Sequence, residues 1–244
     1  MELGALSILI RRFLSHSLLS TVDQEAIADL PHTIKRMSPG EAILREGDRA
    51  MICPIVLSGF AYRQKMVSEG GRQIVALKLP GDALDLQSLY LQQADHDIRA
   101  LTASEFASVP LAALEKLAAE RSAVARAILT DILIESSITR EWLLNIGRRS
   151  ALARLAHLLC ELQDRMNDIA IEDSTHFEVP LTQEQLADLL GLTPVHVNRM
   201  VRQLEKIGAI GRPSRSLTIL HFDSLAKISG FSSAYLHRNN ISRV

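Results

Sequence analysis

The feature that most constrains the fold is a pair of helical patterns joined by one glycine, in the stretch "TQEQLADLLGLTPVHVNRMVRQLEKI". Its first residue, Thr182, is a good N-cap, and Gln185 three residues later completes a capping box. Gly191 supplies a tight turn, and Thr193 caps the second helix. Pro194 then takes the first helical position, where a missing N–H costs nothing. The stretch therefore predicts two short helices that meet at a sharp corner.

The second of these helices has two chemically opposed faces. At 100° per residue, Val197, Val201 and Leu204 fall within about 60° of arc, and the polar residues fall within about 80° on nearly the opposite side. We expect the apolar face to pack on the first helix and the polar face to fit the major groove of DNA. Arg199 is placed for bidentate recognition of a guanine. The alternative is an ordinary helical hairpin with a solvated polar face.

A two-stranded wing is predicted after the second helix, in the stretch "AIGRPSRSLTIL". Pro213 and Ser214 form its turn, and an arginine on either side is placed for a phosphate. The predicted DNA contacts are Thr182, Gln183, Thr193, Pro194, Val195, His196, Arg199, Gln203, Lys206, Arg212 and Arg215.

The first half of the chain has a different character. Between residues 31 and 110, turn signals such as Pro39-Gly40 and Ser58-Gly59 recur, with short strand-like runs between them. This pattern predicts a small all-β sandwich or barrel, preceded by short helices that Thr21 or Asp23 could cap.

Residues 121–147 carry almost no turn signal and predict one long helix. Its apolar stripe has two readings: the helix lies across its own domain, or two copies pair in a coiled-coil seam. We favour pairing, with the interface residues Val124, Ile128, Ile132, Glu135, Thr139, Trp142 and Ile146. Any effector is expected to act through a hinge near residues 147–150.

Composition and motifs exclude several classes of protein. The 244 residues are 47% hydrophobic with a formal net charge of −1, which indicates a packed core and no coating of nucleic acid by bulk charge. No stretch approaches the roughly 20 apolar residues of a membrane span, so we expect a soluble cytoplasmic protein. We find no catalytic Ser/His/Asp spacing, glycine-rich phosphate loop or metal-ligand cluster, and we predict no catalytic residues, no metal site and no enzyme activity.

The order of elements and several motifs resemble the Crp/Fnr family of bacterial transcription regulators over nearly the whole chain. The motifs are "LREGDRA", "VLSGFAY", "LPGDAL" and the helix pair described above. The resemblance implies an α+β fold: a cyclic-nucleotide-binding-like β-roll in residues 1–120, a dimerisation helix in 121–147 and a winged helix-turn-helix in 148–244. It also implies a homodimer on a palindromic operator of double-stranded DNA, with reading helices about 34 Å apart, and RNA polymerase as a further partner.

The residues that would hold a cyclic nucleotide depart from the pattern of the nucleotide-binding relatives. Those relatives carry a Gly-Glu pair for the ribose and an Arg for the phosphate. Here Asp85 lies near the place of the glutamate, Ala94 and Asp95 lie where the arginine belongs, and Arg99 comes five positions late. A buried phosphate facing these acids would be poorly neutralised. We therefore expect no cyclic AMP, and the candidate effector pocket comprises Asp82, Asp85, Arg99, Thr139 and Arg140.

We predict no cofactor. The oxygen-sensing relatives carry an N-terminal cysteine cluster, whereas this chain has only Cys53 and Cys160, so an iron–sulfur cluster is not expected. His96 leaves haem open as an alternative to a solvated loop histidine, and we favour buried packing over redox sensing for Cys53. The chain is most similar to the FixK-like subgroup, which often works without a known ligand. The alternative function is a small-molecule sensor whose helix-turn-helix contacts proteins only.

Overall fold

A computed structural model describes residues 4–167, 178–212 and 217–238. The chain forms two compact units. The first unit comprises Met1–Lys65, Ala76–Ser136 and His237–Val244, and the second comprises Met66–Val75 and Ser137–Leu236. The boundary lies inside the long helix α4 (Ser122–Arg148), whereas the sequence predicted domain limits at the two ends of that helix.

The first unit begins with two short helices, α1 (Ser7–Leu14) and α2 (Thr21–Ala28). The cap of α2 is Ser20, whose side chain accepts from the backbone N–H of Asp23 while the Asp23 side chain accepts from the backbone of Ser20. The prediction of Thr21 or Asp23 as the cap is therefore wrong, by one residue for Thr21 and by three for Asp23, and Asp23 is the second member of the capping box.

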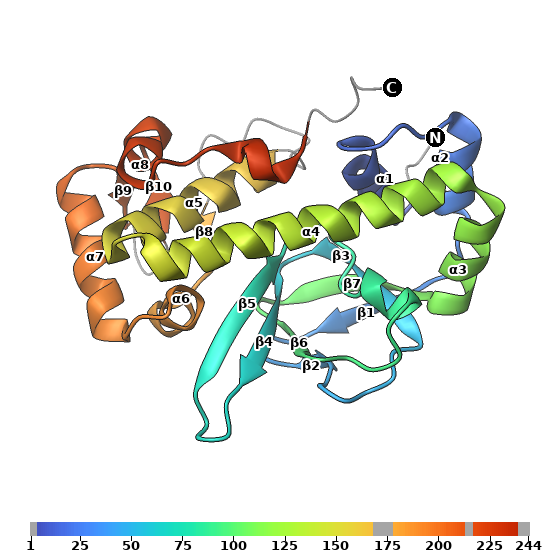
Figure 1. The fold of residues 1–244 in the computed structure, drawn as a ribbon, viewed down its shortest axis with the longest axis horizontal. Coiled ribbons are helices and arrows are strands. Elements are labelled where there is room, and N and C mark those ends of the chain that lie inside the picture. The colour runs from blue at the N-terminus through green and yellow to red at the C-terminus, as the bar shows by residue number, and fades with distance from the viewer. Residues whose placement is uncertain (1–3, 168–177, 213–216, 239–244) are drawn as a thin grey trace. The chain divides into compact units, whose positions relative to one another are not determined.

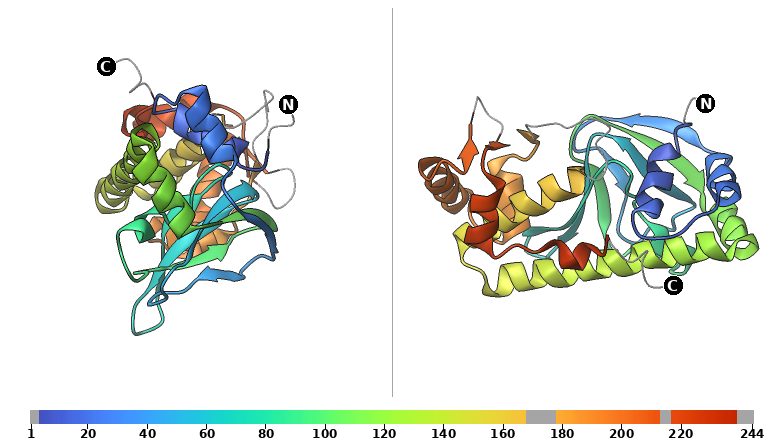
Figure 2. Two further views of the ribbon diagram at one scale, coloured as in Figure 1. Left: turned by 90° about the vertical axis from the view of Figure 1, so that its right-hand side faces the viewer. Right: turned by 90° about the horizontal axis from the view of Figure 1, so that it is seen from above.

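Two antiparallel sheets follow, as the sequence predicted (Figures 1 and 2). One has the order β1-β7-β3, from Thr33–Met37, Ser104–Pro110 and Ile52–Ser58, and the other has the order β2-β6-β4-β5, from Ala42–Leu44, Asp97–Ala100, Ala61–Met66 and Arg72–Lys78. A buried cluster that includes Val56, Ile98 and Phe106 joins strands of both sheets. The β-roll is therefore built around an apolar core.

The predicted turns of the β-roll lie at glycines with positive φ, among them Gly40 and Gly59. At Gly59, φ is +75° and an added Cβ would lie 2.4 Å from Ser104 Oγ. Only glycine combines this backbone conformation with this close approach. The turn after β5 leads into a short 3₁₀ helix, η1 (Leu86–Leu89), and β7 leads into α3 (Leu111–Glu120).

Helix α4 is 27 residues long and runs from Ser122 to Arg148, within one residue of the predicted limits. In its first half, Val124 and Ile128 belong to the buried core of the first unit. In its second half, the Trp142 indole donates to Glu161 Oε2 at 2.9 Å within the second unit. Each half is therefore fixed to a different unit, which explains why the division falls inside the helix.

The second unit holds the predicted helix pair. Its elements are α5 (Ala151–Asn167), β8 (Glu178–Val179), α6 (Gln183–Leu190), α7 (Pro194–Lys206), β9 (Ile210–Gly211), β10 (Leu217–Ile219), α8 (Phe222–Ser229) and η2 (Ser233–Leu236). The fully buried Glu161 of α5 accepts from Trp142 and, at 2.7 Å, from Tyr235, and burial raises the pKa of this carboxyl. Within the described residues, no helix has the length and apolar character that crossing a membrane requires.

Candidate nucleic-acid interface

Helix α6 and its turn have the geometry that the sequence predicted. The Thr182 hydroxyl accepts from the backbone N–H of Gln185 at 3.2 Å, and Gln185 Oε1 accepts from the backbone N–H of Thr182 at 2.9 Å. Gly191 ends the helix in the left-handed conformation, with φ at +61°. Because glycine adopts this conformation without a Cβ penalty, the chain can reverse here and start α7 three residues later.

Helix α7 separates its buried and exposed faces as predicted. Thr193 caps it by accepting from the backbone N–H of His196 at 3.2 Å, and Pro194 is its first residue. Val197, Val201 and Leu204 are fully buried. These residues hold the helix on the body of the second unit.

The opposite face of α7 presents cationic and amide side chains to solvent. Arg199, Gln203 and Lys206 are exposed as predicted, whereas His196 is only half exposed. Arg202 is also exposed and was not predicted, because at 100° per residue it lies about 40° outside the arc of the other polar residues. Three cations thus lie on one face of the helix, Arg199, Arg202 and Lys206.

A recess of about 510 Å³ lies at the N-terminal end of α7. Its lining residues are Gln183, Pro194, Val195, Asn198, Arg199 and Arg202. Asn198 Nδ2 donates to Gln183 Oε1 at 3.1 Å, so this amide pair joins α6 to α7 inside the recess. Gln183 is therefore placed with the α7 residues, as predicted, and Asn198 is a residue that the sequence analysis missed.

The two predicted strands of the wing are present as β9 and β10, and a third strand from outside the predicted stretch, β8, joins them. β9 pairs with β10 through Thr218–Gly211 and Ile219–Ile210, and β10 also pairs with β8. Arg212, at the end of β9, is half exposed. The predicted contact Arg215 and the turn residues Pro213 and Ser214 lie outside the described residues.

The stripe of α4 that we predicted as a dimer interface packs largely within its own chain. Val124 and Ile128 are fully buried, Trp142 is buried, Ile132 packs on the core of the first unit, and Ile146 is half buried. Burial within the chain leaves Val124, Ile128 and Trp142 unable to contact a partner, so the prediction is wrong for them. Glu135 is ion-paired within the chain, and Thr139 is exposed.

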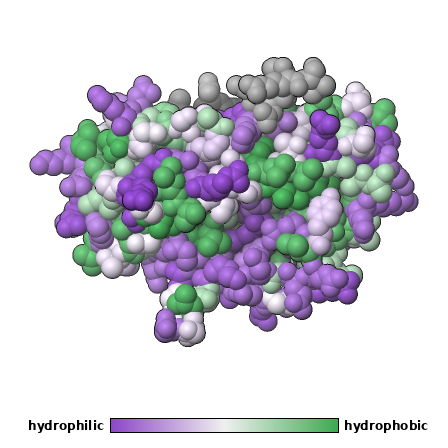
Figure 3. Space-filling model, viewed as in Figure 1, coloured by the Kyte–Doolittle hydropathy of each residue, from purple (hydrophilic) through white to green (hydrophobic). Residues whose placement is uncertain are grey.

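A second row of α4 residues is exposed at alternating spacings of three and four. It comprises Arg126, Leu129, Leu133, Ser136, Arg140, Leu143 and Gly147. Leu129, Leu133 and Leu143 are 52%, 58% and 73% exposed. Figure 3 shows hydrophobic residues at intervals on the face of the molecule on which α4 lies in Figure 1. The spacing is that of the a and d positions of a coiled coil.

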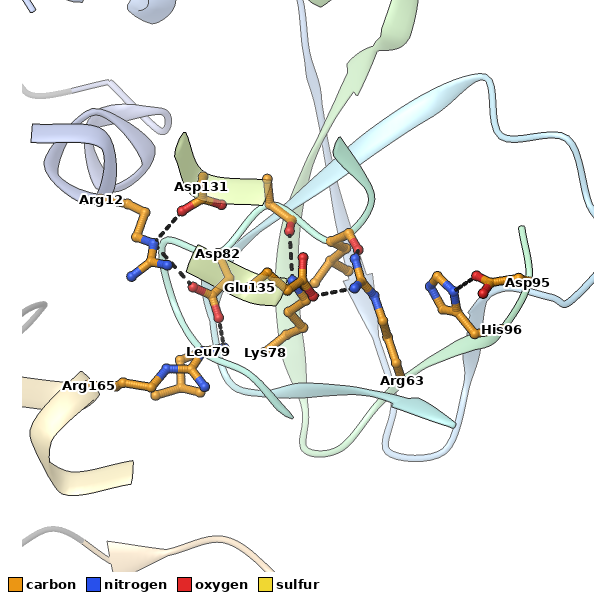
Figure 4. Close-up of polar contacts among 12 residues, drawn as sticks. Arg12, Arg63, Lys78, Leu79, Asp82, Asp95, His96, Asp131, Glu135 and Arg165 are labelled. Atoms are coloured by element: carbon orange, nitrogen blue, oxygen red, sulfur yellow. Dashed lines mark hydrogen bonds and ion pairs between the residues drawn. The ribbon is translucent and has the colours of Figure 1, made fainter. Parts of the chain in front are cut away.

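Inside the β-roll, two buried cations converge on one carboxylate of α4 (Figure 4). Lys78 Nζ of β5 lies 2.8 Å from Glu135 Oε1, and Arg63 of β4 pairs with the same oxygen. Arg63 also donates to the carbonyl of Leu84, and Lys78 donates to the carbonyl of Ala83 at 3.3 Å. Although burial opposes its ionisation, Lys78 and Arg63 lower the pKa of Glu135 below its usual value.

A second group of ion pairs joins α1, the turn after β5 and α4. Arg12 Nε lies 2.9 Å from Asp131 Oδ1 and 3.7 Å from Asp82 Oδ1, and His16 Nε2 lies 3.3 Å from Asp131 Oδ1. Burial raises the pKa of Asp131, but Arg12 and His16 outweigh this effect and the net direction is downward. Asp131 and Asp82 are thus paired with cations of the same unit.

The predicted effector residues are only partly brought together. Asp82 and Asp85, three residues apart in the sequence, are both buried. Asp82 accepts from the backbone N–H of Leu79 at 2.9 Å, and Asp85 accepts from the Ser88 hydroxyl. The Arg99 side chain donates to the Gly40 carbonyl at 3.1 Å and lies 3.8 Å from the Asp97 carboxylate. Neither contact joins Arg99 to Asp82 or Asp85, with which it was predicted to form a pocket. The exposed Thr139 and Arg140 belong to the second unit.

The candidate haem and redox residues are both buried. His96 is only 4% exposed, so its prediction as a solvated loop histidine is wrong; its Nδ1 lies 2.7 Å from Asp95, and burial together with Arg63 lowers its pKa. No group of three or more His, Cys, Asp or Glu side chains among the described residues could hold a metal. Burial raises the pKa of the Cys53 thiol to about 12, which keeps it protonated at neutral pH and disfavours thiolate chemistry.

Comparisons with known proteins agree with this architecture. Residues 34–121 match the cyclic nucleotide-binding domain family, and residues 153–228 match the Crp-like helix-turn-helix domain family. The chain is 32% identical over 195 residues to the nitrogen fixation regulation protein FixK of Bradyrhizobium diazoefficiens, covering 78% of this chain and 80% of that protein. It is 28% identical over 217 residues to the transcriptional activator protein FnrL of Cereibacter sphaeroides, covering 86% and 87%.

Among solved structures, FixK2 from Bradyrhizobium japonicum superposes with a TM-score of 0.75 at 26% sequence identity, covering 83% of this chain and all of that chain. The two matched ranges cover the β-roll and the helix pair. This chain belongs to the Crp/Fnr family of transcription regulators.

Proposed function

We propose that the protein is a homodimeric, sequence-specific regulator that reads a palindromic operator with α7. One observation carries the proposal: α7 buries Val197, Val201 and Leu204 and presents its cations on the opposite face. An α-helix fits the major groove, and an arginine there can donate two hydrogen bonds to a guanine. In this arrangement the phosphates on either side of the groove are contacted by Thr182, Gln183 and Arg212.

Selection from a pool of random DNA duplexes tests this proposal. We expect enrichment of palindromic sequences whose half-sites are centred about 34 Å apart, and affinity that falls with salt by a slope near one for each phosphate contacted. If the helix pair contacts proteins only, as the alternative function holds, no sequence is enriched and binding to DNA is negligible at physiological salt.

We place the dimer contact on the exposed row of α4. Exposed leucines at a and d spacing bury apolar area only when a second helix packs on them. Arg126 and Arg140 occupy further positions of the row, where the apolar stems of their side chains can pack in the seam while the charged ends reach solvent.

Replacing Leu133 by glutamate is expected to convert the dimer to a monomer, because two carboxylates would face each other in the seam. Sedimentation velocity measures the change in mass. The matched control is Ile34→Glu on β1, which adds the same charge at an apolar side chain that is 49% exposed, and which should remain a dimer. A Leu133→Glu protein with the mass of the wild type would remove α4 from the interface.

The interior ion pairs support a regulator that needs no cyclic nucleotide. Glu135 already pairs with both Arg63 and Lys78, and the buried acids Asp82 and Asp85 disfavour a phosphate placed near them. We propose that the protein works without a bound nucleotide, haem or iron–sulfur cluster, that it catalyses no reaction, and that it acts in the bacterial cytoplasm, with RNA polymerase as its partner on the promoter.

A further inference from the structure

We propose that Val195 reads the C5 methyl group of a thymine next to the guanine that Arg199 binds. This inference rests on the proposed function, since it requires α7 to enter the major groove. It assigns base selectivity to an apolar side chain, in addition to the hydrogen-bonding arginine.

The exposure of Val195 is the first observation. Val195 is 82% exposed, more than any other large apolar side chain in the described parts of the chain. A single exposed apolar residue needs no explanation by itself, so its position matters. It is the second residue of α7, at the N-terminal end that lies deepest among the bases in helix-turn-helix proteins.

The recess at this end of α7 is the second observation. Val195 and Pro194 line it together with Arg199, and neither Val195 nor Pro194 has a side-chain donor or acceptor. The amide of Asn198 is engaged by Gln183. This part of the recess therefore favours an apolar group, while Arg199 and Arg202 at its border favour the phosphates and acceptor atoms of DNA.

Spacing joins the two contacts. Val195 and Arg199 are four residues apart and so lie on the same side of the helix, one above the other. Thymine is the base whose major-groove edge carries a methyl group, and apolar side chains contact that methyl. A cytosine at the same place carries only a hydrogen at C5 and would leave Val195 without this apolar contact.

Valine also suits this role energetically. Its side chain is branched at Cβ and prefers one χ1 rotamer in a helix, so little conformational freedom is lost when the methyl group packs against it. Burying one methyl group is worth about 0.8 kcal/mol, which corresponds to roughly a fourfold change in affinity for each half-site.

The test uses the full-length protein and the operator obtained by selection, with each thymine replaced in turn by deoxyuridine. Deoxyuridine removes only the C5 methyl and keeps the pairing edge. For the wild type, we expect one thymine in each half-site at which the replacement weakens binding roughly fourfold. For Val195→Ala, thymine and deoxyuridine at that position should bind equally well.

Lys206→Ala is the matched control, because this exposed α7 residue should weaken binding to all sequences while the effect of the methyl group remains. The assignment of Val195 is overturned if Val195→Ala keeps the wild-type ratio of affinities for thymine and deoxyuridine, or if the wild type binds both equally well. Sequence-specific binding stands in either case. If the selection enriches no sequence, the proposed function fails and this inference fails with it.

Discussion

Glu135→Ala is expected to lower the free energy of unfolding by about 3 kcal/mol. The substitution leaves Arg63 and Lys78 buried, with side chains only 8% and 6% exposed, without the carboxylate that pairs with both. Removing one member of a buried ion pair costs more than the pair contributes, because the remaining charge stays desolvated. Urea denaturation, followed by circular dichroism of the dimer at fixed protein concentration, measures the loss.

Glu105→Ala is the matched control for this substitution. Glu105 pairs with Arg36 at 2.6 Å, but the two side chains are 37% and 86% exposed, so the loss there should stay below about 1 kcal/mol. Replacing all three interior residues by apolar ones, as in Glu135→Leu with Arg63→Met and Lys78→Met, should recover much of the stability. Equal losses in the free energy of unfolding for Glu135→Ala and Glu105→Ala would show that the buried ion pairs contribute no more to stability than an exposed one.

The same ion pairs give the wild type a defined response to acid. Burial raises the pKa values of Glu135 and Asp131. Lys78 and Arg63 outweigh this effect for Glu135, and Arg12 and His16 outweigh it for Asp131, so both pKa values are lowered in the folded protein. A lowered folded pKa contributes stability that is present above the unfolded pKa and is lost as pH falls through the folded one. The acid-induced loss of stability should therefore be smaller in Glu135→Ala than in the wild type.

Local sequence signals predicted the elements of this fold well. The capping box at Thr182, the glycine at 191 and the proline at 194 each act within a few residues, so the sequence contains the whole interaction. The same holds for the β-roll, whose turns lie where glycine and its neighbours indicated them. Such signals depend on backbone conformation and hydrogen bonds within a few residues, and need no knowledge of distant contacts.

Long-range contacts explain what the sequence did not predict. The stripe of Val124 and Ile128 has the periodicity of a coiled-coil seam, but a helix that packs on its own domain has the same periodicity. Only the position of the β-roll core decides which face of α4 is buried. The exposed row that includes Leu133 was present in the sequence as a second, weaker pattern with two arginines in it.

The interior ion pairs illustrate the same limit. Arg63 and Lys78 could be noticed as charges within apolar strands, at places where a buried position is expected. Their common partner, Glu135, lies 72 residues after Arg63, and no local pattern joins them. Arg202 was missed for a different reason. Its Cα lies outside the arc of helix positions that was counted as polar, but the long side chain of an arginine can reach a neighbouring part of the helix surface.

Arg199→Ala is expected to weaken binding to the selected operator by about 2 kcal/mol for each half-site, or roughly 30-fold. The loss should be confined to specific DNA, because the two hydrogen bonds of a guanidinium to guanine carry base discrimination. Repeating the selection with the variant should show relaxed preference at one guanine in each half-site. Arg199→Lys should recover little, since lysine keeps the charge but has no planar pair of donors.

Arg212→Ala separates base reading from attraction by charge. Arg212 lies at the end of β9, where we propose that it contacts a phosphate, so its loss should weaken all sequences alike and reduce the salt slope by about one. If Arg199→Ala behaves in the same way as Arg212→Ala, Arg199 binds the DNA backbone, and another side chain of α7 must read the guanine. Unchanged selectivity in Arg199→Ala together with an unchanged salt slope would remove Arg199 from the DNA interface.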